Sequence, residues 1–247
     1  MQSSKIGVVK VLRRYPVKGM RGEDLDSIFI AKSGFVGDRN YTFIDRNAPN
    51  KAFPWMTARL RREMLLYEPR IMAGDVVNVK TPEGPTYSVS DPSFLKLLES
   101  RFNYSLELKH DRSGCYDSKP ISIFGLATLR ALESKIGKQL VRERFRANIY
   151  PEWDCGEPFF EDSLLGKTLQ IGDMARITVV KKNSRCVVPT LDPQTAEPAP
   201  QVLKYIEEKR GGLAGVYALV EREGEVKVND EISLLDASLD PWSQNKS

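Results

Sequence analysis

One cysteine of the chain lies in a context that could do chemistry. In the segment KKNSRCVVPTLDPQT, Cys186 directly follows Arg185 and has Lys181 and Lys182 upstream. Neighbouring cations lower the pKa of a thiol and favour the thiolate, which is both a nucleophile and a ligand for soft metals. The alternative is a buried, inert cysteine in a strand, because free cysteines are among the most buried residue types.

The composition of the chain limits the chemistry open to Cys186. The 247 residues include three cysteines, Cys115, Cys155 and Cys186, and one histidine, His110. The cysteines lie far apart with no C-x-x-C pair, which argues for free thiols and against a zinc ribbon. A single histidine leaves no His-rich metal site and one candidate base for a Cys-His pair. Metal ligation or a persulfide therefore fits Cys186 better than nucleophilic attack of the papain type.

Arginine is concentrated in three segments that are distant in the sequence: RRYPVKGMRG, MTARLRRE and VRERFRANI. The last segment is interpreted as a strand, in which Arg142, Arg144, Arg146 and Asn148 fall at a spacing of two and share one face. Stacked cations repel one another, so this face needs either water or an anion. Asn148 favours the anion, because an amide can donate and accept hydrogen bonds and so orient a heterocycle.

Polar residues near the N-terminus could complete such an anion site. Lys18 and Gly19 follow a proline in YPVKG, where the backbone can come close to a ligand. Arg39 ends the turn GDR before an expected strand and could point at a phosphate, while Asp38 could cap that turn.

Two further segments offer polar groups at short spacing. Thr57 and Arg59 in MTAR lie two residues apart, on one face if this segment is extended. Asp192 follows Cys186 by six residues and precedes Pro193. An Asp-Pro turn explains Asp192 as structure, and ordering the mouth of a site is the functional alternative.

The elements expected to position these residues are mostly strands. Residues 6–45, 64–73 and 75–84 alternate apolar and polar residues or are rich in β-branched types, with Gly, Asp or Asn at the breaks. Strands are also predicted in RFRANIYP, KTLQIGDMARITVVKK and RCVVPTL. AGVYALVEREGEVKVNDEISLL predicts a hairpin turning at Glu223 and Gly224, followed by a last short strand after Asp230.

Three helices are predicted between these strands. Asp91 as N-cap and Pro92 at the first helical position begin the first helix. The second carries leucines at helical spacing and ends near Gly137, and the third, PQVLKYIEEKR, is closed by Gly211. Many strands with few helices between them predict a mainly β (α+β) fold, a barrel with covering helices.

Charge and hydropathy limit the class of protein. Lys and Arg total 37 against 33 Asp and Glu, and this net charge of +4 is too mild to indicate nucleic-acid binding. The arginine segments also lack the interleaved aromatics of single-strand binders. No apolar run approaches the roughly 18 to 20 residues of a membrane span, and the N-terminus lacks the order of a secretory signal. We expect a cytoplasmic protein that binds neither membrane nor nucleic acid.

Seven motifs in this order resemble a known family: YPVKGMRG, GDRNYTFID, MTAR, RFRANI, EDSLLGKTLQIGD, SRCVVPTLDPQT and VKVNDEISLL. They are similar to the N-terminal β-barrel and MOSC domains of the molybdenum-cofactor proteins that include the mitochondrial amidoxime reducing component and its bacterial relatives. The resemblance runs through almost the whole chain. It implies an N-terminal β-barrel domain over residues 1–110 and a MOSC-type β-barrel domain over residues 111–240.

The resemblance also implies a cofactor, a molybdenum held by a molybdopterin dithiolene, with Cys186 as the one thiolate that the protein supplies to the metal. Asp192 is expected to order the mouth of the site or to act there as a proton donor. The residues implied to hold the phosphate and the pterin are Lys18, Gly19, Arg39, Thr57, Arg59, Arg144, Arg146, Asn148, Ser184 and Arg185.

Members of this family reduce N-hydroxylated compounds such as amidoximes, hydroxylamines and hydroxylated bases, so a small N-hydroxylated substrate is expected. Three cysteines are too few for an iron–sulfur domain here, and electrons are expected from a separate ferredoxin-like, flavin or cytochrome protein. The alternative is a non-catalytic carrier of the cofactor, or of activated sulfur on Cys186.

The chain departs from the family pattern at Ala147, at Ser122 and in AEPAP. The loops at residues 115–120 and 189–200 are expected to set the substrate range.

Overall fold

A closed barrel of seven strands forms the larger part of the molecule. The computed structural model describes residues 3–235, and its largest sheet has the order β12-β11-β15-β14-β13-β17-β1-β2. Because β1 also pairs with β12, the sheet closes on itself and β2 extends it at one side. The strands are β1 (Ser3–Arg14), β2 (Glu23–Leu25), β11 (Ile121–Ile123), β12 (Ile149–Trp153), β13 (Thr168–Ile171), β14 (Ala175–Ser184), β15 (Leu213–Arg222) and β17 (Glu231–Leu235).

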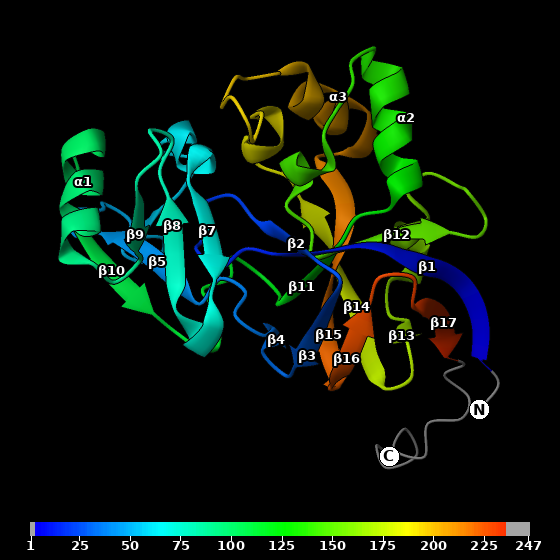
Figure 1. Ribbon diagram of the computed structural model, residues 1–247. Helices are drawn as coiled ribbons and strands as arrows, with labels where there is room; N and C mark the ends of the chain where they lie inside the picture. The colour runs from blue at the N-terminus through cyan, green and yellow to red at the C-terminus, as the bar shows by residue number, and fades with distance from the viewer. Residues whose placement is uncertain (1–2, 236–247) are drawn as a thin grey trace.

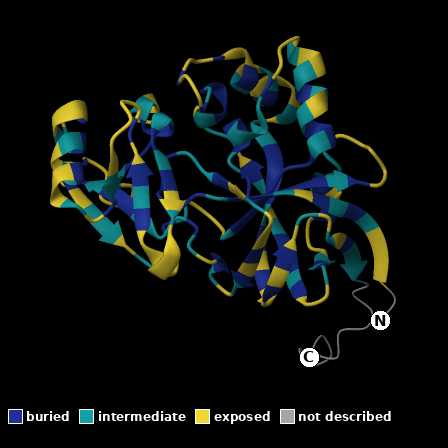
Figure 2. Cartoon of the chain, in the orientation of Figure 1, coloured by how far each residue is buried: buried dark blue, intermediate teal, exposed yellow. Residues whose placement is uncertain are grey.

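Alternation along the strands builds the barrel core. The inward residues Val9, Ile123, Leu169, Ile177 and Val216 belong to one cluster of buried aliphatic side chains. Burial of this kind contributes roughly 1.5–3 kcal/mol per large side chain, and closure removes the sheet edges that would otherwise need protection. Figure 2 shows the buried strand segments at the centre of the barrel and exposed residues on its outer side.

A three-stranded sheet extends the barrel core. It has the order β16 (Gly224–Lys227), β3 (Ser27–Ala31) and β4 (Gly34–Phe35). The predicted hairpin at Glu223 and Gly224 is therefore wrong, since β15 pairs with β11 and β14 and β16 pairs with β3. The crossover places Val226 against Ile28 and Ile30 in the barrel core, and this burial outweighs a local reversal of the chain.

A second lobe contains two small sheets and a helix. The sheets are β10 (Leu106–His110), β5 (Tyr41–Asp45) and β6 (Trp55–Met56), and β7 (Glu68–Ile71), β8 (Val77–Lys80) and β9 (Thr86–Ser88). They enclose a separate core that includes Phe43, Tyr67, Phe94 and Leu98. Two short 3₁₀ helices, η1 (Arg62–Leu66) and η2 (Ala73–Asp75), connect the strands. In Figure 1 this lobe lies to the left of the barrel, with α1 (Pro92–Phe102) on its outer side.

The three predicted helices are confirmed, and local chemistry explains their ends. The Asp91 side chain accepts a hydrogen bond from the Ser93 backbone N–H at 2.8 Å and caps α1. Gly137 and Gly211, at φ 69° and 58°, end α2 (Leu126–Ile136) and α3 (Gln201–Arg210) in the left-handed conformation that glycine adopts readily. Helices α2 and α3 cover one end of the barrel (Figure 1) over a third buried cluster.

The fold is mainly β with covering helices, as the sequence predicts. The division at residue 110 stays a prediction, and β1 of the first range pairs with β12 and β17 of the second. Within residues 3–235, no helix is long and apolar enough to cross a membrane. The expected cytoplasmic location also stays a prediction.

Candidate functional site

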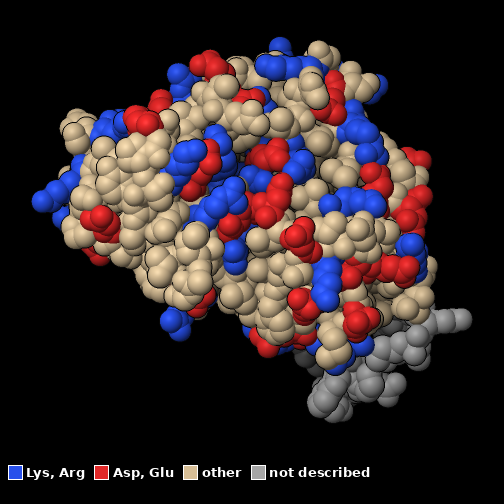
Figure 3. Space-filling model, in the orientation of Figure 1, with Lys and Arg blue, Asp and Glu red and all other residues tan. Residues whose placement is uncertain are grey.

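A cavity of about 280 Å³ collects the predicted site residues. Both lobes line it, the smaller through the segments around Lys18 and Arg59 and the barrel through the segments around Arg146 and Cys186. Basic and acidic side chains gather between the two lobes on the face seen in Figure 3. The predicted residues that line the cavity are Lys18, Gly19, Arg39, Thr57, Arg59, Arg144, Arg146, Asn148, Ser184, Arg185 and Cys186.

The segment RERFRAN is not a strand, and this prediction is wrong. Residues 142–145 form the 3₁₀ helix η3 (Arg142–Phe145), and Arg146 adopts a left-handed conformation with φ 52°. Residues two apart share one face only in extended backbone. In this helical turn Arg142 does not line the cavity with the other arginines but pairs with Asp24 at 2.8 Å. Arg144 and Arg146 still line the cavity because the turn points both inward.

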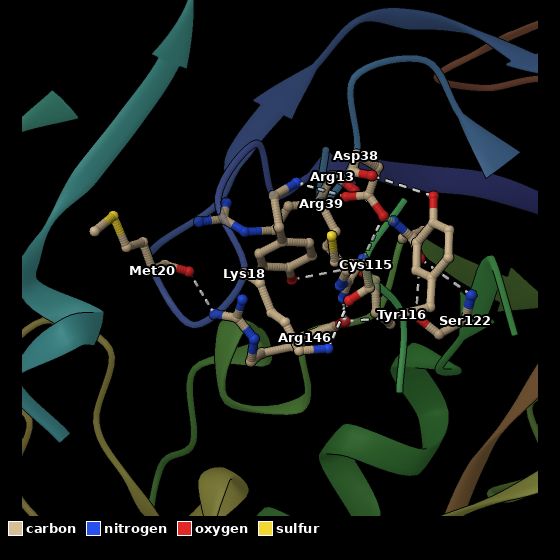
Figure 4. Close-up of polar contacts among 12 residues, drawn as sticks. Arg13, Lys18, Met20, Asp38, Arg39, Cys115, Tyr116, Ser122 and Arg146 are labelled. Carbon is tan, nitrogen blue, oxygen red and sulfur yellow. Dashed lines mark hydrogen bonds and ion pairs between the residues drawn. The ribbon is translucent and has the colours of Figure 1, made fainter. Parts of the chain in front are cut away.

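Asp38 ties the N-terminal turn to the arginine segment. Its carboxylate is fully buried and accepts hydrogen bonds from the Tyr15 backbone N–H at 2.7 Å and the Asn148 amide at 3.1 Å. The Arg39 guanidinium also donates to this carboxylate, and its other end donates to the Arg146 carbonyl at 3.0 Å. Figure 4 shows Asp38, Arg39 and Arg146 in this network. Asp38 thus fixes Arg39 and Asn148 at the cavity wall.

Gly19 and Thr57 shape the cavity through their backbones. Gly19 has φ 86°, and a Cβ there would lie 3.0 Å from the Thr57 Cα, so only glycine fits without strain. The segment of Thr57 is a turn and not extended, since the Leu60 and Arg61 N–H groups donate to the Thr57 carbonyl. The turn nevertheless leaves both Thr57 and Arg59 on the cavity wall.

Two arginines of the cavity have no carboxylate partner within ion-pair distance among the described residues. Arg146 donates to the Met20 carbonyl at 2.6 Å and lies 4.4 Å from the Tyr15 ring centroid. Burial lowers its pKa to about 10, so it stays charged at neutral pH. Arg185 donates to the Phe145 carbonyl at 2.6 Å, and burial likewise lowers its pKa. A cation removed from water is costly unless it is paired, so this part of the cavity favours an anion.

Arg144 is held in place from the Pro-rich loop. Its buried guanidinium donates to the Thr190 carbonyl and to the Asp192 carboxylate, both at 2.7 Å. Burial lowers the pKa of Arg144, and the charge of Asp192 partly offsets this. Asp192 does not line the cavity, and its other oxygen accepts from the Gln194 N–H at 2.9 Å. The observed contacts make Asp192 a positioning residue for Arg144; its predicted role at the mouth stays a prediction.

A salt-bridged trio bridges the two sides of the cavity. Lys18 donates to the Asp117 carboxylate and to the Cys115 carbonyl, both at 2.6 Å, and Arg59 donates to the other Asp117 oxygen. Burial acts to raise the pKa of Asp117, but the charges of Lys18 and Arg59 outweigh it and hold that pKa below its usual value. Burial lowers the pKa of Lys18, and Asp117 opposes the shift. Asp117 therefore stays ionised and fixes both cations.

Cys186 lies in a loop and not in a strand. β14 ends at Ser184, the Arg185 N–H donates to the Gly212 carbonyl at 2.8 Å, and the chain then enters the 3₁₀ helix η5 (Val188–Thr190). The strand predicted for RCVVPTL is therefore wrong, because Pro189 has no N–H for a strand ladder and suits the first turn of a helix. Cys186 is partly exposed on the cavity wall, which Arg59 also lines.

These observations test whether the cavity fits a phosphate-bearing molybdenum cofactor. The Nε atoms of Arg144 and Arg185 are buried and have no hydrogen-bond partner among residues 3–235, although both guanidinium groups reach the cavity. Orphaned donors and two cations without a carboxylate suit a phosphate and the polar edges of a heterocycle. A thiol on the same wall suits a soft metal that arrives with sulfur ligands of its own. The residues present fit the group.

Some lining residues were not predicted from the sequence. Tyr217 lies on β15 between Val216 and Ala218, which point into the barrel core. Strand alternation in the sequence would have placed Tyr217 on the face away from that core. The loop around residues 115–120 was predicted to set substrate range, but no single residue of it was assigned to the site. The unpredicted polar residues of the lining are Tyr116, Asp117, Ser118, Lys119, Ser122, Lys181, Asn183 and Tyr217.

Fold and site together define a β-barrel protein with a cationic ligand cavity beside a single thiol. The family model of the MOSC domain matches residues 109–233, and that of the MOSC N-terminal beta barrel domain matches residues 6–104. The chain belongs to the MOSC domain family, and the resemblance seen in the sequence motifs is confirmed.

A curated relative and two solved structures are similar to the chain. It is 33% identical over 138 residues to human (Homo sapiens) mitochondrial amidoxime-reducing component 1, a match that covers 51% of this chain and 40% of the relative. The YUAD protein from Bacillus subtilis aligns with a TM-score of 0.49 and 14% identity over 94% of this chain and 98% of that one. YiiM from Geobacillus stearothermophilus aligns with a TM-score of 0.38 and 19% identity over 49% and 56%.

Proposed function

We propose that the protein is a molybdenum-cofactor oxidoreductase that reduces small N-hydroxylated compounds. The observation that carries this proposal is the convergence of Arg146, Arg185 and Cys186 on one cavity. Both arginines lack a carboxylate partner among residues 3–235, and the thiol shares the cavity wall. Membership of the MOSC family and the partial match to an amidoxime-reducing component support it.

Different residues of the cavity hold different parts of the cofactor. Arg146 and Arg185 neutralise the phosphate, and Asn148, whose amide is fully hydrogen-bonded to Ser122, Arg13 and Asp38, fixes the cavity wall behind them. Cys186 supplies a thiolate to molybdenum. When bound, the cofactor supplies a two-electron reduction at the metal, by which an N–OH compound takes up two electrons and two protons and yields the N–H compound and water.

Other residues of the chain prepare the site for that reaction. Asp117 holds Lys18 and Arg59 in place at the wall of the cavity that Cys186 also lines. Electrons come from a separate protein of ferredoxin-like, flavin or cytochrome type.

The test uses protein made in a host that synthesises the cofactor. With reduced methyl viologen as an artificial donor, we expect conversion of benzamidoxime to benzamidine by the wild type and by Cys155→Ala, whose thiol is exposed and outside the cavity. Cys186→Ala should be inactive. Cofactor-loaded protein that reduces no amidoxime, hydroxylamine or N-hydroxylated base would refute the enzyme and favour a carrier of the cofactor or of sulfur on Cys186.

A further inference from the structure

Two lysines of the cavity have no role in the proposed function. Lys119 lies in the loop before β11, and Lys181 lies on β14. Both side chains are exposed, and neither makes an ion pair or hydrogen bond with any residue in the described part of the chain. They bring two positive charges to the cavity in addition to those of the arginine segment.

Four of the other cations of the cavity have a carboxylate partner. Arg39 pairs with Asp38, Arg144 pairs with Asp192, and Lys18 and Arg59 share Asp117. Arg146 and Arg185 have no carboxylate partner in the described part of the chain, and a phosphate monoester, with up to two negative charges, matches them. Lys119 and Lys181 add two more cations to this set, and their side chains have no partner among residues 3–235.

Lys181 has polar neighbours on the adjacent strands of the barrel. Lys181 lies opposite Tyr217 in the β14–β15 ladder, and Tyr217 lies opposite Ser122 in the β15–β11 ladder. These three residues follow one another across adjacent strands, and all three line the cavity. Register irregularities on both sides of Lys181 in β14 break the regular alternation there, as bulges beside binding sites often do. The wall therefore places the Lys181 ammonium group beside Tyr217, whereas the Ser122 hydroxyl already donates to Asn148.

We propose that Lys119 and Lys181 bind a carboxylate or phosphate group carried by the substrate. The preferred substrates are then anionic N-hydroxylated compounds, and neutral ones of the same size are poorer. This inference rests on the proposed function for the identity of the reacting group, but the charge count that motivates it does not depend on turnover.

The test compares ligands that differ in one charged group. Benzamidoxime and its para-carboxylate and para-phosphonate derivatives are given to cofactor-loaded wild type and to the Lys119→Gln/Lys181→Gln double variant. We expect the KM of the two anionic compounds to rise about tenfold in the double variant, as for loss of charge-assisted contacts. The KM of benzamidoxime and the molybdenum and pterin contents should not change. Lys167→Gln, which removes an exposed lysine outside the cavity, is the matched control.

Two results would overturn the inference. An equal change of KM for neutral and anionic compounds would remove the anion specificity, and loss of pterin from the double variant would assign the lysines to the cofactor. If no variant reduces any of the compounds, the proposed function fails, and calorimetric binding of the same ligands decides the role of the lysines. Wild type should then bind the anionic compounds more tightly than the neutral one, and the double variant should not; equal affinities in wild type would refute the inference.

Discussion

Replacing Asp192 by Asn tests whether this residue positions Arg144. Both carboxylate oxygens accept hydrogen bonds, one from the Arg144 guanidinium at 2.7 Å and the other from the Gln194 N–H at 2.9 Å. An amide can accept at only one of these places and must turn its NH₂ towards a donor at the other. Asp192→Asn therefore removes the charge and creates a donor–donor contact.

The expected cost follows from the burial of the pair. Removing one partner of a fully buried ion pair costs about 3–5 kcal/mol. The Arg144 side chain is 3% exposed and that of Asp192 is 24% exposed, so solvent offsets part of the loss, and Arg144 keeps its bond to the Thr190 carbonyl. We expect a loss of about 2–3 kcal/mol, which for a chain of this size lowers Tm by roughly 5–10 °C.

Scanning calorimetry of the cofactor-free protein measures this effect. Glu197→Gln is the control, because Glu197 lies in the same loop, is exposed and makes no ion pair with a described residue; its change should stay within about 0.5 kcal/mol. A Tm of Asp192→Asn equal to that of Glu197→Gln would show that the pair contributes nothing and would refute the positioning role.

Three further predictions test the fold and the electrostatics. Burial raises the pKa of Glu161, so its stabilisation is complete below the unfolded pKa of about 4.3 and is lost as the pH rises through the folded pKa; in urea unfolding Glu161→Gln should cost most near pH 4 and least near pH 8. Hydrogen bonds from Arg130 lower the pKa of Glu152, so Glu152→Gln should show the opposite trend, and parallel trends would contradict both assignments. Inorganic phosphate should stabilise the cofactor-free protein and so raise its Tm, with a gain of about 2.7 kcal/mol at a phosphate concentration of one hundred times Kd. The rise in Tm should be smaller for Arg146→Met than for Arg130→Met, and equal rises would contradict the anion site. Gly7→Ala should cost about 1–3 kcal/mol in urea unfolding, because the new Cβ would lie 2.7 Å from the Glu152 carbonyl where β1 and β12 close the barrel; an unchanged midpoint would argue against this closure.

Local chemistry in the sequence predicted the helices and several strands. Asp91 and Pro92 mark the start of α1, and Gly137 and Gly211 mark the ends of α2 and α3, because caps act on residues within one turn of each other. The strand pair β13 and β14 was predicted for the same reason, as its turn is short.

Long-range pairing was beyond such patterns. The segment of β16 follows β15 directly, yet it pairs with β3, almost two hundred residues earlier in the chain. The left-handed Arg146 also breaks a spacing that looked like a strand. In both cases tertiary contacts decide, and a pattern in a short window cannot report them.

The same distinction holds for the candidate site. Arg144, Arg146 and Cys186 were found because their residue types suggest anion binding and metal ligation wherever they lie. Lys119 and Tyr217 look like ordinary surface and strand residues, and only the folded chain brings them to the cavity.

The most direct test of the central claim is the molybdenum and oxidised-pterin content of purified protein, expressed where the cofactor is made. Wild type and Cys155→Ala should contain about one molybdenum per chain. Cys186→Ala should lose the metal while its circular dichroism spectrum stays that of the wild type. An unchanged molybdenum content in Cys186→Ala, or wild-type protein that contains neither molybdenum nor pterin, would contradict the assignment of Cys186 and its cavity to a molybdenum cofactor.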